Sequence, residues 1–166
     1  MKNGDVLLII SDYLKREKDV SDKMNPTIRS KIIFGVVAIM KHAHKKGVIL
    51  RDLKLNHILL DDNLEPAINP SSLSTFLTNP FDMEMGIGTP FFMTPEVFMN
   101  EDNSYDFSVD VYEYAFVLYK MFSNKIDFEN KIIKSPQQYM ILIGKGHRPK
   151  KQDNIPGHYW ELIEKC

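Results

Sequence analysis

The sequence has a single cysteine, no long apolar run and almost no net charge. Because Cys166 is the one cysteine in 166 residues, an internal disulfide framework is excluded and a reducing compartment is expected. The apolar runs at 6–10 and 34–40 are too short to be a signal peptide or a membrane span. With 21 Lys and Arg against 22 Asp and Glu, no global charge favours nucleic acid or a membrane as a partner. We therefore expect an intracellular, cytoplasmic protein whose recognition is local.

Hydrophobic residues make up 43% of the sequence, which is enough to build the core of one domain. The pattern predicts a short helix over 5–18 and a longer, one-sided helix that opens at Asn25 and stops at Gly47. Residues 107–122 are apolar nearly all the way round, so we expect a helix buried on every side. Asp110 is interpreted as a lone acid in that helix, and a buried acid needs hydrogen-bond partners.

The segments between these helices are irregular. Residues 48–61 contain two short apolar clusters separated by a charged stretch, Arg51 to Lys54, which we predict to be a loop. With four prolines and two glycines, residues 66–90 are predicted to form an irregular loop, and loops of that length are usually functional or disordered. A short helix is expected near 136–144 and a last helix from 158 onward, within which the sequence stops.

Four landmarks occur in a fixed order along the sequence. They are LRDLKLNHILLD at 50–61, GTPFFMTPE at 88–96, SVDVYEYAFVLYKM at 108–121 and GHRPKKQDNIPGHYWELIEKC at 146–166. Together they resemble the catalytic loop, the substrate-positioning loop, the central buried helix and the late helices of protein kinases. The resemblance is closest to the tyrosine-kinase-like group of serine/threonine kinases. It implies a mainly α fold, the kinase C-terminal lobe with a short β pair at the catalytic loop, as a partial kinase domain over 1–166 that is truncated within a late helix.

The resemblance assigns roles to several positions that keep the family's residue. Asp52 would accept the proton of the substrate hydroxyl, Arg51 would hold a phosphorylated loop residue, and Lys54 would steady the transferred phosphate. In the substrate loop, Thr89 would tie the loop to Asp52 and Lys54. The other retained positions are Pro95 and Glu96, which close the substrate loop, and Asp110 and Arg148, which are structural. Asp110 would hydrogen-bond the backbone of the catalytic loop, and Glu96 would lack its usual arginine partner.

Other positions depart from the family pattern, and the losses concern metal binding. Leu50 replaces the histidine before the Arg-Asp pair, and His57 replaces the asparagine that ligates magnesium. Asn56 is one residue early, and on a strand it would face the opposite side. The main metal-binding aspartate falls on Pro70. Magnesium prefers hard oxygen ligands, so we predict no metal site and no cofactor for this chain, with ATP and magnesium expected only for a complete, active kinase.

Three hypotheses for function follow. The first is a pseudokinase-type module that acts through a protein partner, because the glycine-rich loop, strand lysine and helix glutamate of an N-terminal lobe would precede residue 1. The second is a serine/threonine kinase that transfers the γ-phosphate of ATP to protein hydroxyls, with the rest of its domain outside this chain. The third is a decayed or truncated product without a biochemical role. His57 is interpreted as a packed or capped histidine, with a transition-metal ligand as the alternative.

Overall fold

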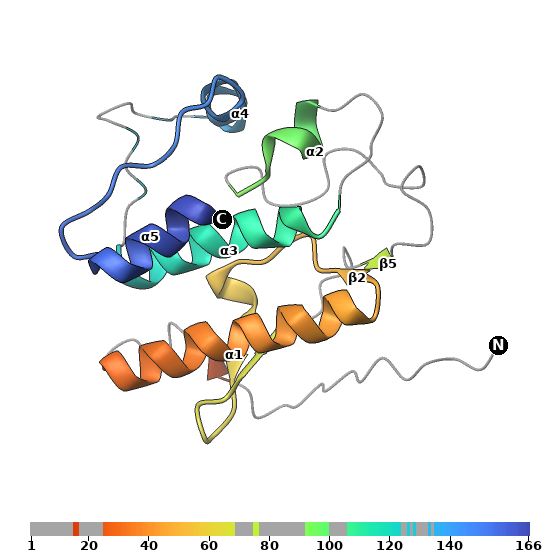
Figure 1. The fold of residues 1–166 in the computed structure, drawn as a ribbon, viewed down its shortest axis with the longest axis vertical. Coiled ribbons are helices and arrows are strands. Elements are labelled where there is room, and N and C mark those ends of the chain that lie inside the picture. The colour runs from red at the N-terminus through yellow and green to blue at the C-terminus, as the bar shows by residue number, and fades with distance from the viewer. Residues whose placement is uncertain are drawn as a thin grey trace.

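The computed structural model of the protein describes residues 25–68, 92–99, 106–123, 126, 128, 133 and 135–166, together with the backbone of 15–16 and 75–76. The elements of these parts are β1 (Lys15–Arg16), α1 (Pro26–Lys45), β2 (Val48–Ile49), η2 (Leu55–His57), β3 (Ile58–Leu60), β4 (Pro66–Ile68), β5 (Thr75–Phe76), α2 (Pro95–Met99), α3 (Ser108–Phe122), α4 (Pro136–Gly144) and α5 (Gly157–Lys165). Figure 1 shows α1 and α3 side by side, α5 along α3, and α2 with α4 at the other end of the molecule. The predicted fold class, mainly α with short strands beside the charged loop, is confirmed.

The first long helix, α1, begins and ends where the sequence predicts. The Asn25 side chain caps it by accepting a hydrogen bond of 2.9 Å from the Ile28 N–H, and Pro26 occupies the first turn, where no donor is needed. Gly47 follows the helix with a φ of 74°, a left-handed conformation that a glycine adopts without strain. The buried residues of this helix are Ile32, Ile33, Val36 and Met40, which recur at helical spacing.

The central helix, α3, is mostly buried, as its apolar sequence predicts, but not on every side, because Val111 is 36% exposed. Ten of its residues are buried, and Asp110 and Glu113 are the acidic residues among them. Tyr114, Val117, Leu118 and Met121 pack with α1 and with the strands on one side, while Phe116 packs with α4 on the other. Because α3 contacts α1, η2 and α5, residues that project from it can hold the backbone of neighbouring segments in place.

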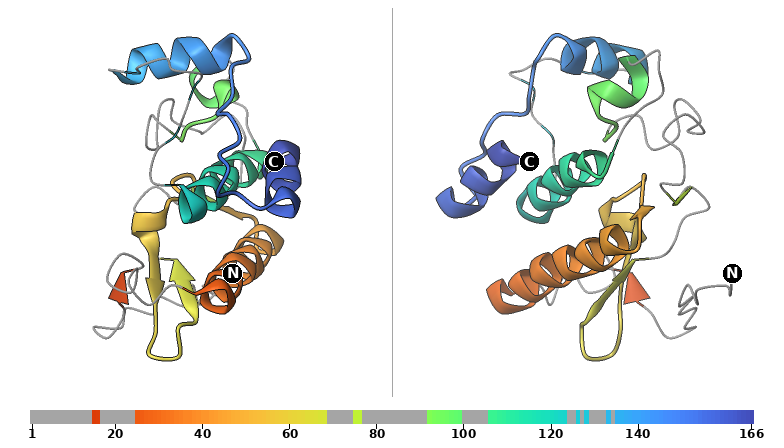
Figure 2. Two further views of the ribbon diagram at one scale, coloured as in Figure 1. Left: turned by 90° about the vertical axis from the view of Figure 1, so that its left-hand side faces the viewer. Right: turned by 45° about the vertical axis from the view of Figure 1, so that its right-hand side comes forward.

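The short strands form two separate sheets around the charged loop. β2, before the loop, pairs with β5, in which Val48 lies opposite Phe76. β3, after the loop, forms a hairpin with β4, and Figure 2 shows this hairpin alongside α1. The contact is close, because a β-carbon added to Gly35 in α1 would clash with Cγ of Pro66 in β4. The hairpin and α1 therefore form one packed unit.

Two predictions of local structure are wrong where the structure describes them. Lys15–Arg16, expected in a helix over 5–18, is strand β1, which pairs antiparallel with Leu59–Leu60 of β3. The pairing edge of β3 lies far away in sequence, so the local pattern could not indicate it. The expected irregular loop over 66–90 contains β4 and β5. The other residues of both segments lie outside the described part of the chain.

Helices α4 and α5 follow the sequence closely. Ser135 caps α4 by accepting from the Gln138 N–H at 3.3 Å, and α4 begins at Pro136 within the range predicted for it. α5 covers α3 and completes the large core cluster through Tyr159 and Ile163. In the residues that the structure describes, no helix is both long enough and apolar enough to cross a membrane.

Candidate functional site

The candidate site is the loop from Leu50 to His57, which joins β2 to β3 and ends in the 3₁₀ turn η2. The backbone at Arg51 has a φ of 67°. This left-handed conformation costs a non-glycine residue about 1–2 kcal/mol. The side chains of Arg51 and Asp52 are buried, and Leu53 is fully packed in the core. A strained backbone at such a position persists only if neighbouring groups hold it.

Asp110 of α3 holds the start of the loop. Its Oδ1 accepts from the Leu50 N–H at 3.1 Å and from the Arg51 N–H at 2.9 Å, and its Oδ2 accepts from the Leu50 N–H at 2.9 Å. The side chain is fully buried, with 0% exposure, so these bonds replace all of its hydration. This is the arrangement that the resemblance implies for Asp110, and it fixes the backbone on both sides of the strained residue.

A second acid on α3, Glu113, holds the next part of the loop. Its Oε2 accepts from the Leu53 N–H at 2.7 Å. Burial raises the pKa of Glu113 well above its ordinary range; the carboxylates of Asp110 and Asp52 raise it further, while the Leu53 N–H and Lys54 lower it. The interpretation of Asp110 as a lone acid was therefore wrong. Glu113 lies three residues later, on the same face of the helix, and that spacing was the signal that sequence reasoning missed.

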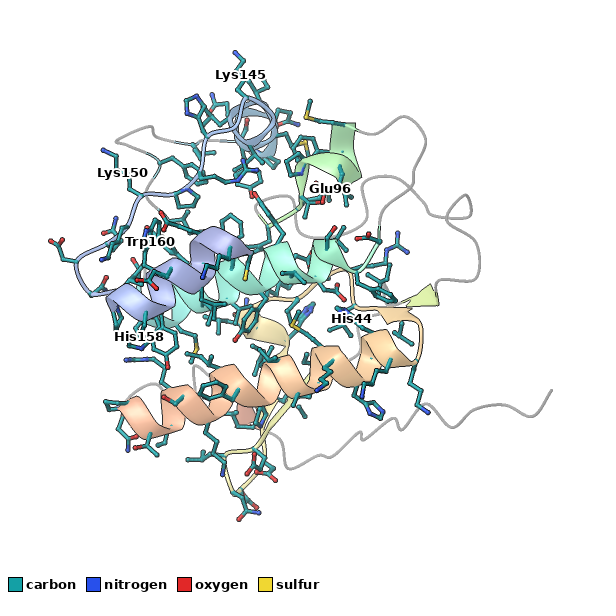
Figure 3. All side chains as sticks on the ribbon, viewed as in Figure 1. His44, Glu96, Lys145, Lys150, His158 and Trp160 are labelled. Atoms are coloured by element: carbon teal, nitrogen blue, oxygen red, sulfur yellow. The ribbon has the colours of Figure 1, made fainter. Side chains whose placement is uncertain are left out.

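His44, near the end of α1, completes the support of Asp110. Its Nε2 lies 2.7 Å from Oδ2 of Asp110, and its ring stacks on Phe107 with 4.6 Å between centroids. Figure 3 labels His44 between α1 and α3, where it links the two helices that carry the core. The sequence analysis did not identify this histidine, because a single histidine near a helix end carries no distinctive pattern.

Asp52, Lys54 and His57 lie together at the other end of the loop. Lys54 Nζ is 2.9 Å from Oδ2 and 3.2 Å from Oδ1 of Asp52. His57 Nδ1 lies 2.9 Å from the backbone oxygen of Asp52 and 3.4 Å from its Oδ2. A carbonyl oxygen can only accept, so Nδ1 carries the proton of this hydrogen bond. His57 is thus a packed, hydrogen-bonded residue, as the first of its two interpretations stated.

Of the two positions at which the family binds magnesium, the structure describes the one that holds His57. Asn56 and His57 lie in the 3₁₀ turn η2, so the expectation that a strand would turn Asn56 to the opposite face was wrong about the element. Asn56 lines a cavity that His57 does not line, whereas His57 contacts the backbone oxygen of Asp52. No group of His, Cys, Asp and Glu side chains within the described segments is arranged to hold a metal ion. Pro70 lies outside those segments.

The residues of the substrate loop are partly described. Thr89 lies outside the described residues, whereas Pro95 and Glu96 form the first turn of α2, on which Figure 3 labels Glu96. Within the described segments no ion pair to Glu96 is found. Arg148 instead donates to the backbone oxygens of Ile143 and His147 at 3.1 and 3.0 Å, and its guanidinium lies 5.5 Å from the centre of the Tyr112 ring. Arg148 therefore holds the end of α4 against α3.

A mainly helical body, in which a buried acid of the central helix holds an Arg-Asp loop between short strands, defines a protein-kinase-like C-terminal lobe. Comparison with known families agrees, since the model of the protein kinase domain matches residues 1–166. The chain belongs to the protein kinase family. Members of this family transfer a phosphoryl group with the help of magnesium ions bound to ATP.

Curated relatives bear serine/threonine kinase names. A probable LIM domain-containing serine/threonine-protein kinase of Dictyostelium discoideum is 34% identical over 135 residues, which are 81% of this chain and 20% of that protein. The RGS domain-containing serine/threonine-protein kinase A of the same organism is 33% identical over 133 residues, which are 80% of this chain and 11% of its own length. A dual serine/threonine and tyrosine protein kinase of Danio rerio is 28% identical over 166 residues, 96% of this chain and 18% of the relative. The chain spans a fifth or less of each of these proteins.

Proposed function

We propose that this chain is a kinase C-terminal lobe of the pseudokinase type, which acts by binding a protein partner and does not transfer phosphate. The observation that carries the proposal is the contact between His57 and Asp52. At the position where the family has a magnesium-ligating asparagine, an imidazole N–H is bound to the backbone oxygen of Asp52 at 2.9 Å. A neutral imidazole is a poor ligand for magnesium, which favours oxygen donors in near-octahedral geometry.

The residue at the other metal position of the family supports the same proposal. Pro70, at the position of the main metal-binding aspartate, cannot supply a carboxylate. If each lost charge-stabilising contact raises the barrier by about 3 kcal/mol, as for one oxyanion donor, two losses reduce the rate by about four orders of magnitude. The described residues therefore fit poorly with bound magnesium and ATP, and we propose no cofactor for this chain.

One observation favours the second candidate function, a serine/threonine kinase of the tyrosine-kinase-like group. Lys54 and Asp52 are in contact at 2.9 Å, which keeps a base and a phosphate-binding cation side by side on a loop of the family's form. In this case ATP would phosphorylate protein hydroxyls, and the remaining parts of the domain would lie outside this chain. Asp52 would be the base, and its pairing with Lys54 would have to open when substrate binds.

Nucleotide binding and phosphotransfer separate the two candidates. We expect no magnesium-dependent binding of ATP in calorimetric titrations of this chain, and no phosphotransfer above that of an Asp52→Asn variant. The same measurements should be made on the longest natural product that contains the sequence. The variant His57→Asn restores an oxygen ligand at one position and serves as a matched comparison. Magnesium-dependent binding by the unmodified protein, or phosphotransfer that Asp52→Asn abolishes, would contradict the proposal and support the kinase.

A further inference from the structure

A small cavity lies beside the catalytic loop, on the side where Asn56 projects. Its volume is about 170 Å³, and three elements meet around it: the end of the loop with η2, the segment before α2, and the second half of α3. The polar groups around it are Lys54, Asn56 and Lys120, and the apolar walls include Phe92, Phe116 and Val117. Basic and amide side chains thus line the cavity together with the rings of Phe92 and Phe116, which meet edge to face with 5.6 Å between their centroids.

The charge of this cavity comes from Lys120. Within the described segments Lys120, which is half-buried in the last turn of α3, has no ion pair, whereas Lys54 is paired with Asp52 at 2.9 Å. Glu113, which is buried and bonded to the Leu53 N–H, does not line the cavity. The net charge that faces a ligand is therefore positive, and the Asn56 amide adds a neutral donor beside it.

The size of the cavity limits what it can hold. Pockets for nucleotides and drug-sized molecules occupy about 300–1,000 Å³, so this one is too small for ATP. A cavity of about 150 Å³ holds a molecule the size of benzene, which is comparable to one side chain. The methylene groups of an acidic side chain would contact the phenyl rings of Phe92 and Phe116, while its charged end would meet the donors of Lys120 and Asn56.

We propose that this cavity binds the carboxylate of a glutamate or aspartate side chain in an acidic segment of a partner protein. The proposal deepens the proposed function, on which it rests for the claim that the bound protein is a partner and not a substrate. Two donors, the Lys120 ammonium and the Asn56 amide, match the two oxygens of a carboxylate. A phosphate dianion suits the cavity less, because it brings about two charges and three acceptor oxygens to a site with one ammonium that is unpaired in the described part of the chain, that of Lys120, and one amide donor.

The test is a binding series with the full chain and fluorescent peptides. The peptides share one Gly-Ser-Ala spacer and differ in a central triplet of glutamate, phosphoserine, alanine or lysine, and fluorescence anisotropy reports their affinity. We expect the glutamate peptide to bind most tightly and its binding to weaken as salt is raised, since the screening length falls from about 8 Å at 0.15 M to about 3 Å at 1 M ionic strength. Lys120→Glu should weaken it at least about tenfold, because like charges would then face each other.

The control variant, Lys151→Glu, makes the same charge change at an exposed lysine that does not line the cavity. It should change the affinity by less than about twofold. Equal binding of the glutamate and alanine peptides, or equal effects of the two variants, would overturn the site. Binding of the phosphoserine peptide alone would overturn the choice of a carboxylate. A separate assay distinguishes a failure of the proposed function from a failure of the binding site. It uses ATP and a glutamate peptide that carries a serine beside its triplet. Phosphorylation of this peptide that requires Asp52 would overturn the proposed function and leave the site intact.

Discussion

Removing the Asp110 carboxylate should release the catalytic loop and destabilise the whole fold. In Asp110→Ala the N–H groups of Leu50 and Arg51 lose the acceptors that they now reach at 2.9 to 3.1 Å. A buried donor without a partner costs about 1–3 kcal/mol, so two cost about 2–6 kcal/mol, and breaking a buried charged interaction costs about 3–5 kcal/mol. We therefore expect the free energy of unfolding to fall by about 3–5 kcal/mol.

Asp110→Asn should cost much less, about 1–2 kcal/mol, because one oxygen remains. The amide oxygen can take the place of Oδ1, which accepts from both Leu50 and Arg51. The amide nitrogen then replaces Oδ2 and loses the bond from the Leu50 N–H at 2.9 Å, but it can donate to Nε2 of His44 in the other tautomer of that ring. The graded order of the two variants thus follows from the acceptor geometry. A loss of packing volume alone would leave Asp110→Asn as stable as the unmodified protein, since asparagine and aspartate have nearly the same shape.

Urea unfolding followed by circular dichroism measures the stabilities, and hydrogen exchange measures the protection of the Leu50 and Arg51 amides. Protection of these two amides should drop in Asp110→Ala before that of the amides within α1. Asp153→Asn, at an exposed aspartate, is the control and should lie within about 0.5 kcal/mol of the unmodified protein. The reasoning is refuted if Asp110→Ala is as stable as this control, or if Asp110→Asn is as costly as Asp110→Ala.

Two further predictions concern Glu113 and Gly35. Glu113→Gln keeps an acceptor for the Leu53 N–H but cannot ionise. The pKa of Glu113 is raised in the folded state. The stability of the unmodified protein relative to this variant should therefore be greatest below pH 4.5, the ordinary pKa of a glutamate, and should fall as the pH rises toward the raised pKa. Parallel curves of unfolding free energy against pH would contradict this. Gly35→Ala should lower the unfolding free energy, because overpacking against Pro66 costs about 1–3 kcal/mol and the gain in helix propensity is only about 1 kcal/mol. A higher midpoint of thermal unfolding for Gly35→Ala would contradict this, because it would show that α1 and β4 can move apart without a loss of stability.

Helices α1 and α3 were predictable because their signals are local. Asn25, Pro26 and Gly47 bound α1, and the apolar sequence of 107–122 indicated a buried helix, as the structure shows for most residues of α3. Capping and helical periodicity act within a few residues, so no knowledge of the fold was needed. The strand at Lys15–Arg16 was missed for the opposite reason, because its pairing partner in β3 lies far along the chain.

The candidate site was predictable in its loop and only partly in its support. The motif around Asp52 located the loop, and the need of a buried acid for partners indicated the hydrogen bonds of Asp110. Glu113 and His44 escaped because their residue types are common on helices and because what they contact depends on how α1, α3 and the loop pack. Long-range packing decides these contacts, and a single sequence does not carry that information locally.

The hydrogen bonds from α3 to the loop also determine when the loop can take its shape. They join residues 50–53 to Asp110 and Glu113 across 59 or 60 positions of the chain. Contacts at such separations form only after the intervening chain has closed into a loop. The backbone hydrogen bonds of α1 and of the β3–β4 hairpin, by contrast, join residues that are close in sequence. During synthesis the residues of the loop therefore emerge early, but they can take their final conformation only once α3 has been made.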